Sequence, residues 1–209
     1  MLCGKTAARA VALDLIERAA VAVFFGAMAC SLLTSWQESG NIVSLVLLLS
    51  ESSVVVFVVI RRYTSDVSVQ PLDWLIALLG TTAPLLVRPT GGEPLVSLSV
   101  CAPLMLAGMV LQVAAKFALS RSFGVVAANR GVKIGGPYRL VRHPMYAGYV
   151  MTQIGFLLTN PSAWNTAVYG FALACQIGRI LAEERVLVRD PSYRAFAAAV
   201  PYRLVPCVF

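Results

Sequence analysis

Long apolar runs separated by short polar segments recur along most of the chain. A helix that crosses the hydrocarbon core of a membrane needs about 20 mostly apolar residues. Several runs approach or reach that length, and the pattern favours helices over short alternating strands. The sequence therefore predicts an all-α, polytopic membrane helix bundle with about five or six membrane helices. The apolar runs cover residues 19–33, 42–60, 72–87, 95–119, 145–158 and 163–181.

The last two runs are separated only by residues 159–162, with the sequence Thr-Asn-Pro-Ser. An Asn-Pro-Ser turn ends one helix and begins the next, because proline is favoured at the first helical position. We therefore expect the last two membrane helices to form a helical hairpin. Its first arm, at about 1.5 Å per residue, is about 21 Å long and is short for a full crossing.

Basic residues alternate with the apolar runs. Short loops rich in Lys and Arg stay on the cytoplasmic side of a membrane. Arg88 is the basic residue of the intervening loops, so we expect both termini to be cytoplasmic. A compact chain with few spans is typical of a multi-pass protein of a prokaryotic inner membrane. The basic residues in the remaining segments are Lys5, Arg9, Arg18, Arg61, Arg62, Arg121, Arg130, Lys133, Arg139, Arg142, Arg185, Arg189, Arg194 and Arg203.

The composition supports a membrane location. Hydrophobic residues make up 58% of the chain and charged residues 13%, against roughly 45–50% and 25% in soluble domains. The net charge is +7, and the basic residues lie between the apolar runs rather than along one face. This distribution argues against nucleic acid as a partner. The five cysteines are scattered and His143 is the only histidine, so neither a disulfide framework nor a metal site is expected.

No linker, repeat or low-complexity tract divides the sequence, so we expect one integrated domain. Residues 1–120 supply N-terminal transmembrane helices. Residues 121–209 form a cofactor-binding catalytic region that includes the membrane hairpin. The sequence leaves the oligomeric state open.

A polar segment stands at the cytoplasmic start of the predicted hairpin, over residues 135–149. Pro144 can begin a helix there, which leaves backbone N–H groups free at the helix N-terminus. Such a terminus, with Arg139 and Arg142 beside it, favours an anion. Tyr146 and Tyr149 offer aromatic faces to a cation. The alternative is a basic membrane anchor with an interfacial aromatic belt.

A second polar cluster stands at the end of the returning arm. Arg179 and Glu183 are four residues apart, so they share a helical face and can pair. The hairpin brings these residues and Glu184 back to the cytoplasmic side, close to His143. Two polar clusters that converge at one membrane face favour a site for a charged cofactor, although terminal acidic residues are also common as ordinary surface charges.

The pattern G-x-Y-x-x-x-R-H-P-x-Y-x-G over residues 136–148 resembles the Arg-His-Pro motif of the isoprenylcysteine carboxyl methyltransferase and phospholipid methyltransferase superfamily. The Asn160-Pro161 turn, the Glu183-Glu184 pair and Tyr193 follow in the order of that superfamily. The resemblance covers residues 121–206. Arg-His-Pro alone is a weak signal, whereas the combination is specific.

This resemblance implies an integral-membrane enzyme that uses S-adenosylmethionine to methylate a lipophilic small-molecule or lipid-modified acceptor. It implies a cofactor cavity enclosed by membrane helices and the C-terminal segment. By position in the motif, Arg179 resembles an arginine that orients the methyl acceptor, and Glu183 is its catalytic companion. The cofactor-binding residues that the resemblance implies are Tyr138, Arg142, His143, Pro144, Tyr146, Gly148 and Glu184.

The leading expectation is a carboxyl O-methyltransferase similar to the isoprenylcysteine enzymes. Phospholipid amines and long-tailed phenols are alternative acceptors. A carboxylate is already ionised at neutral pH, whereas an amine or phenol benefits from a base such as His143 or a glutamate. A different hypothesis is a non-catalytic membrane scaffold or transporter. Glu51 in the second apolar run supports it, because ionisable groups within a membrane often mark function.

Overall fold

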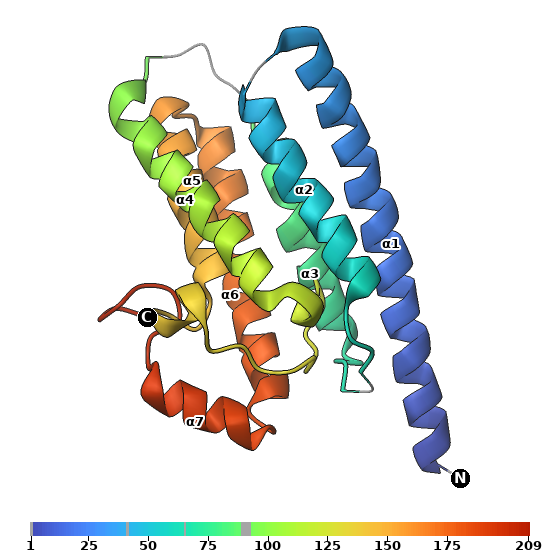
Figure 1. The fold of residues 1–209 in the computed structure, drawn as a ribbon. Helices are drawn as coiled ribbons and strands as arrows, with labels where there is room; N and C mark the ends of the chain where they lie inside the picture. The colour runs from blue at the N-terminus through green and yellow to red at the C-terminus, as the bar shows by residue number, and fades with distance from the viewer. Residues whose placement is uncertain (1, 41, 65, 89–92) are drawn as a thin grey trace.

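The computed structural model describes residues 2–40, 42–64, 66–88 and 93–209. These residues are helical apart from connecting segments and one isolated bridge between Val67 and Ala128, with no strand among them. Figure 1 shows long helices packed side by side, with α7 across one end. The α-helices are α1 (Leu2–Ser39), α2 (Ile42–Ile60), α3 (Pro71–Thr82), α4 (Leu98–Leu119), α5 (Pro144–Thr159), α6 (Ala163–Leu187) and α7 (Pro191–Ala199); the 3-10 helices are η1 (Ala83–Leu86), η2 (Ser120–Ser122) and η3 (Gly136–Arg139).

Local sequence accounts for where several of these helices begin. Pro144 occupies the first turn of α5, as expected, because its fixed φ suits a position whose N–H has no helical partner. Pro161 precedes α6 and is not its first residue. Instead the Ser162 hydroxyl caps α6 by accepting a hydrogen bond from the Asn165 N–H at 3.0 Å. The turn at Asn160 and Pro161 therefore separates α5 from α6 in the expected place.

Helices α4 and α5 form the most extensive helix pair in the bundle. Two glycines make their close approach possible, because a Cβ at Gly148 would lie only 2.5 Å from the Gly108 carbonyl oxygen. A Cβ at Gly108 would in turn lie 2.7 Å from the Gly148 carbonyl oxygen. This contact holds the start of α5, and with it the Arg-His-Pro segment, against α4.

Two helices of the described chain are long and apolar enough to cross a membrane, over Val11–Glu38 and Leu98–Ser122. A shorter apolar segment runs over Pro71–Leu86. Many large apolar side chains on the bundle face outward, and so large an exposed apolar surface is typical of a lipid-facing or partner-facing protein. They include Val56, Val59, Leu72, Leu75, Leu78, Leu98, Val100, Leu106, Val110 and Phe171.

The first helix is longer than the expected span of residues 19–33, because α1 runs from Leu2 to Ser39. In Figure 1 the N-terminus, α7 and the C-terminal segment lie in the lower half of the molecule. The turn between α5 and α6, the C-terminal end of α1 and the N-terminal end of α2 lie at the opposite end. The side chain of Glu51, on which the scaffold hypothesis depends, lies outside the described part of the structure.

Candidate active site

Glu184 is the centre of a dense polar cluster at the C-terminal end of α6. Its Oε2 accepts a hydrogen bond from Arg203 Nε at 2.9 Å. Its Oε1 lies 3.2 Å from Arg142 Nη1 and 3.3 Å from His143 Nε2. The Tyr193 hydroxyl donates to the same oxygen at 3.2 Å. The carboxylate therefore joins α6 to the Arg-His-Pro segment, to α7 and to the C-terminal segment.

These partners decide the ionisation state of Glu184. Burial alone would raise the pKa of this carboxyl. Hydrogen bonds from His143 and Arg203, together with the charges of His143 and Arg142, outweigh burial and hold the pKa at about 2. Glu184 is consequently a carboxylate at any physiological pH, and it acts as a fixed anchor for its neighbours.

The C-terminal segment is bound to the Arg-His-Pro segment through its backbone. The Arg142 N–H donates to the Tyr202 carbonyl at 2.9 Å, and the His143 N–H donates to the Arg203 carbonyl at 2.9 Å. These bonds place Arg203 beside Glu184. The chain after α7 thus closes one side of the polar cluster.

Glu183 points the other way from the same helical turn. Its Oε1 accepts a hydrogen bond from the Tyr146 hydroxyl, and its Oε2 lies 3.6 Å from His143 Nδ1. The two ring nitrogens of His143 thus face two different glutamates. The rings of His143 and Tyr146 meet edge to face, with centroids 5.8 Å apart.

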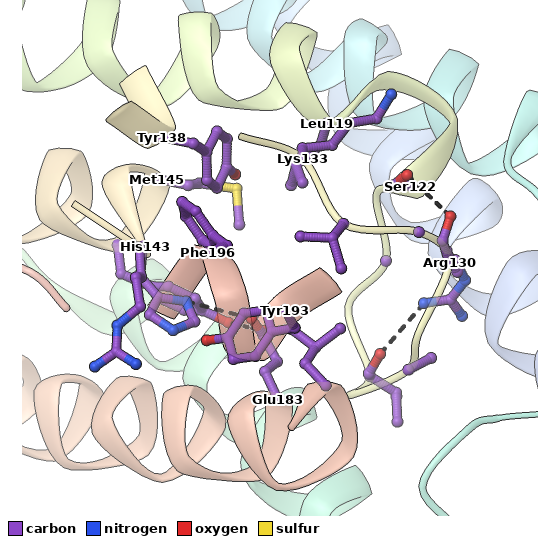
Figure 2. Close-up of a pocket in the computed structure, with 18 residues that line it drawn as sticks. Leu119, Ser122, Arg130, Lys133, Tyr138, His143, Met145, Glu183, Tyr193 and Phe196 are labelled. Atoms are coloured by element: carbon purple, nitrogen blue, oxygen red, sulfur yellow. Dashed lines mark hydrogen bonds and ion pairs between the residues drawn. The ribbon is translucent and has the colours of Figure 1, made fainter. Parts of the chain in front are cut away.

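A first cavity opens beside these residues. Figure 2 shows His143, Glu183 and Tyr193 together on one side and Arg130 with Ser122 on the other. Burial and the nearby Glu183 raise the pKa of Tyr138 well above its ordinary value, so its phenol stays a hydrogen-bond donor. The lining includes Gly124, Val126, Arg130, Lys133, Tyr138, Arg142, His143, Met145, Tyr146, Glu183, Leu187, Tyr193 and Phe196.

A second cavity lies within the helix bundle. Met145 lines both cavities. Most of the second lining is apolar, and no Asp, Glu or His is among the described residues that form it. The lining includes Phe24, Phe25, Met28, Val54, Leu85, Met109, Gln112, Lys116, Phe123, Tyr149, Thr152, Tyr169, Gln176 and Arg179.

Arg179 stands where the two cavities meet. Its guanidinium carbon lies 5.3 Å from the centroid of the Tyr146 ring, which borders the first cavity. The expected pair with Glu183 does not form, because Arg179 Nη2 donates to the Val125 carbonyl at 3.0 Å and Nη1 to the Thr81 hydroxyl at 3.4 Å. Both acceptors are neutral. Arg179 is buried and its Nε has no hydrogen-bond partner.

Comparison with protein families matches residues 96–191 to the phospholipid methyltransferase model. This family lies in the isoprenylcysteine and phospholipid methyltransferase superfamily, and the matched residues make up a little under half of the chain. The match indicates a membrane methyltransferase that acts on lipid, from a family that generally uses S-adenosylmethionine. A comparison with curated proteins finds no match.

Most of the residues that the sequence analysis singles out lie in or around the first cavity. Tyr138, Arg142, His143, Tyr146 and Glu183 line the first cavity. The others lie around it: Glu184 holds the wall, Arg179 lines the second cavity, Pro144 is buried at the start of α5, and Gly148 packs against α4. The exposed Arg139 is not part of either lining.

The sequence analysis did not predict a buried charge cluster that joins the N-terminal helices to the wall of the first cavity. Asp14 and Glu17 of α1 form ion pairs with Arg61, which follows α2, and with Arg130 of the cavity wall. All four side chains are almost completely buried. Two acidic residues three apart at the start of an apolar run were a visible signal, but their partners are distant in sequence.

Proposed function

We propose that this protein is an S-adenosylmethionine-dependent methyltransferase that esterifies a carboxylate on a lipophilic acceptor, in the manner of the isoprenylcysteine carboxyl O-methyltransferases. The cofactor occupies the first cavity, and the acceptor occupies the second. The observation that carries the choice of acceptor is the buried guanidinium of Arg179, which has neutral partners only and borders a cavity without a described acidic side chain.

The donor set of the first cavity suits S-adenosylmethionine. This cofactor supplies a methyl group on a positively charged sulfur, to be transferred by in-line displacement. Glu183 supplies a carboxylate and Tyr138, Tyr146 and Tyr193 supply aromatic faces, all of which favour a cation. Lys133 and the N-terminus of α5 favour the carboxylate of the amino-acid part. Glu184 does not line this cavity, but its contacts with Arg142, His143 and Tyr193 hold the cavity wall in place.

The second cavity suits a lipid tail with an anionic end. The hydrogen-bond partners of the buried Arg179 guanidinium are neutral, and an incoming carboxylate would add a directly paired negative charge with up to two parallel hydrogen bonds. Because Arg179 lies over Tyr146, it would hold the acceptor oxygen at the border with the first cavity. The geometry thus favours catalysis by positioning, which can contribute up to about 7–11 kcal/mol.

The lining of the second cavity also favours a carboxylate over a base-dependent acceptor. A carboxylate is ionised at neutral pH, whereas an amine or phenol must lose a proton. The His143 ring nitrogens face Glu183 and Glu184 and do not border the second cavity. The description of the matched family favours a phospholipid amine as a second candidate acceptor. The two candidates differ in the bond that is formed.

The membrane arrangement that fits this function has α1, α2, α4, α5 and α6 crossing or entering the bilayer, with α3 as a shorter segment. We expect the hairpin of α5 and α6 to turn at the outer side. Both termini, α7 and the polar cluster then lie on the cytoplasmic side, where the basic loops also lie. The acceptor would enter the second cavity laterally from the lipid.

Calorimetric titration of detergent-purified protein with S-adenosylmethionine and S-adenosylhomocysteine tests this function. We expect micromolar binding that His143→Ala and Glu184→Ala each weaken by tenfold or more, about 1.4 kcal/mol. Arg139→Ala, an exposed change in the same segment, should leave it unchanged. Absence of binding by folded wild-type protein would contradict the proposal and favour a scaffold or transporter.

A further inference from the structure

The buried charge cluster of α1 meets the acceptor side of the site through a single peptide group. The peptide between Val125 and Val126 presents its two polar atoms to two different side chains. Its N–H, on Val126, donates to Glu17 Oε1 at 3.0 Å. Its carbonyl, on Val125, accepts from Arg179 Nη2 at 3.0 Å. Glu17 and Arg179 therefore hold the same peptide from opposite sides.

Glu17 fixes this peptide more firmly than one hydrogen bond would. Its Oε1 also accepts from the Val125 N–H at 2.8 Å, so one carboxylate oxygen binds two successive backbone amides. Its Oε2 accepts from Arg130 Nη2 at 3.0 Å, which holds the other end of the same loop. Hydrogen bonds in series polarise one another, so the Val125 carbonyl is a better acceptor for Arg179 while Glu17 stays in place.

The loop has little freedom to adopt another path. A Cβ at Gly124 would lie 2.1 Å from Arg130 Nη1, and Gly131 has a φ of +100°, which favours glycine. The Ser122 hydroxyl donates to the Arg130 carbonyl at 3.0 Å. These features wrap the loop around the Arg130 side chain, whose guanidinium forms ion pairs with Glu17 and Asp14.

We propose that Glu17 is a positioning residue for methyl transfer: its carboxylate orients the Val125–Val126 peptide, which in turn orients the Arg179 guanidinium toward the acceptor. Glu17 lies outside the region that matches the methyltransferase family. The N-terminal helices accordingly contribute to the alignment of the acceptor as well as to membrane anchorage. This role rests on the proposed function, since it requires Arg179 to contact the acceptor.

Two conservative variants separate the effect of side-chain length at position 17 from the effect of side-chain charge. Glu17→Gln keeps an oxygen that can accept from both amides but removes the charge that faces Arg61 and Arg130. Glu17→Asp keeps the charge but is one methylene shorter and withdraws from the amides. With an N-acetyl S-farnesyl cysteine as the probe acceptor, positioning predicts that Glu17→Asp lowers kcat by about tenfold and that Glu17→Gln stays within about threefold of wild type. The tenfold loss corresponds to about 1.4 kcal/mol.

Asp14→Asn is the matched control, because Asp14 pairs with Arg61 and Arg130, whereas the Val125 and Val126 amides donate to Glu17. It should leave kcat within about threefold of wild type. In an Arg179→Lys background, Glu17→Asp should cost less than about threefold, because residues that act through one another are not additive. Cofactor affinity should stay within about threefold in every variant.

Amide hydrogen exchange supplies a readout that needs no turnover. Glu17→Asp should speed exchange at Val125 and Val126, whereas Glu17→Gln and Asp14→Asn should leave it near the wild-type rate. Equal losses of kcat for Glu17→Asp and Glu17→Gln, or additivity with Arg179→Lys, would overturn the positioning role alone. Wild-type protein that binds no S-adenosylmethionine would instead overturn the proposed function on which it rests.

Discussion

Glu184 and Arg179 lie on the same helix, yet Glu184 pairs with charged side chains whereas Arg179 donates hydrogen bonds to neutral groups. Glu184 has partners from three other segments, and two arginines and a histidine surround it. Arg179 is buried, but the acceptors of its hydrogen bonds are neutral. The directly paired charge of Glu184 holds protein segments together, whereas the guanidinium of Arg179 can still pair directly with a ligand. In the function that we propose, this contrast separates a group in the wall of the cofactor cavity from a group that recognises the acceptor.

The largest effect is expected at Arg179, whose hydrogen-bond partners are neutral. Arg179→Ala should lower kcat by about 10²–10³-fold, as loss of an oriented donor does elsewhere, while the Kd for S-adenosylmethionine stays within about threefold. Rates with a lipid carboxylate and calorimetry on the same preparation measure both quantities. Arg185→Ala is the control, because Arg185 is half-exposed on the same helix and pairs with Asp73. A tenfold or greater loss of cofactor affinity in Arg179→Ala would contradict the division between the cavities.

Glu184→Gln should lower cofactor affinity more than kcat, which is the reverse of the effect expected for Arg179→Ala. Loss of the Glu184 carboxylate releases Arg203, Arg142 and Tyr193 from one anchor and loosens the cavity wall. We expect cofactor affinity to fall by at least about tenfold, equivalent to about 1.4 kcal/mol, and the thermal midpoint in detergent to fall as well. Glu93→Gln changes an exposed glutamate and should alter neither. Unchanged affinity in Glu184→Gln would show that the wall does not depend on this carboxylate.

Gly148→Ala tests whether the glycine that ends the Arg-His-Pro motif serves packing. The added Cβ would meet the Gly108 carbonyl and Gln112 of α4, so the free energy of unfolding should fall by about 1–3 kcal/mol through overpacking. Gly170→Ala on α6 is the matched control, because a Cβ there meets nothing within 4 Å. It should be neutral or slightly stabilising. Thermal midpoints of both variants in one detergent give the comparison.

The smallest expected effect is the pH dependence of stability. The pKa of Glu184 is lowered in the folded protein to about 2 from an ordinary value of 4.5. Its contribution to stability is therefore fully present above about pH 4.5 and is lost as the pH falls toward 2. The wild-type thermal midpoint should decrease more steeply over that interval than the midpoint of Glu184→Gln. Parallel curves would show that Glu184 does not carry this dependence.

Local signals in the sequence predicted the elements that depend on nearby residues. The start of α5 at Pro144 follows from the fixed φ of proline, and the turn before α6 follows from the Asn-Pro-Ser segment. The convergence of His143 with Glu183 and Glu184 followed from the expected return of the chain after that turn. The closing contacts of Tyr193 and Arg203 depend on the path of the C-terminal segment, which the sequence pattern does not specify.

Long-range electrostatics accounts for what the sequence could not show. Spacing on a helix suggested that Arg179 and Glu183 pair, but Tyr146 and His143 compete for Glu183, and a backbone carbonyl from another segment takes Arg179. The contact between Glu17 and the Val125–Val126 peptide joins residues more than a hundred positions apart. Such contacts are set by tertiary packing, and a local pattern does not encode them.

The most direct test of the account is the bond that the protein forms. Purified protein with methyl-labelled S-adenosylmethionine is offered an N-acetyl S-farnesyl cysteine, phosphatidylethanolamine or a long-tailed phenol. The account predicts label on the prenylated carboxylate, released as methanol by mild alkali, and its loss in Arg179→Ala. Alkali-stable label on the amine of phosphatidylethanolamine, with the carboxylate unlabelled, would contradict the assignment of Arg179 as a carboxylate-binding residue.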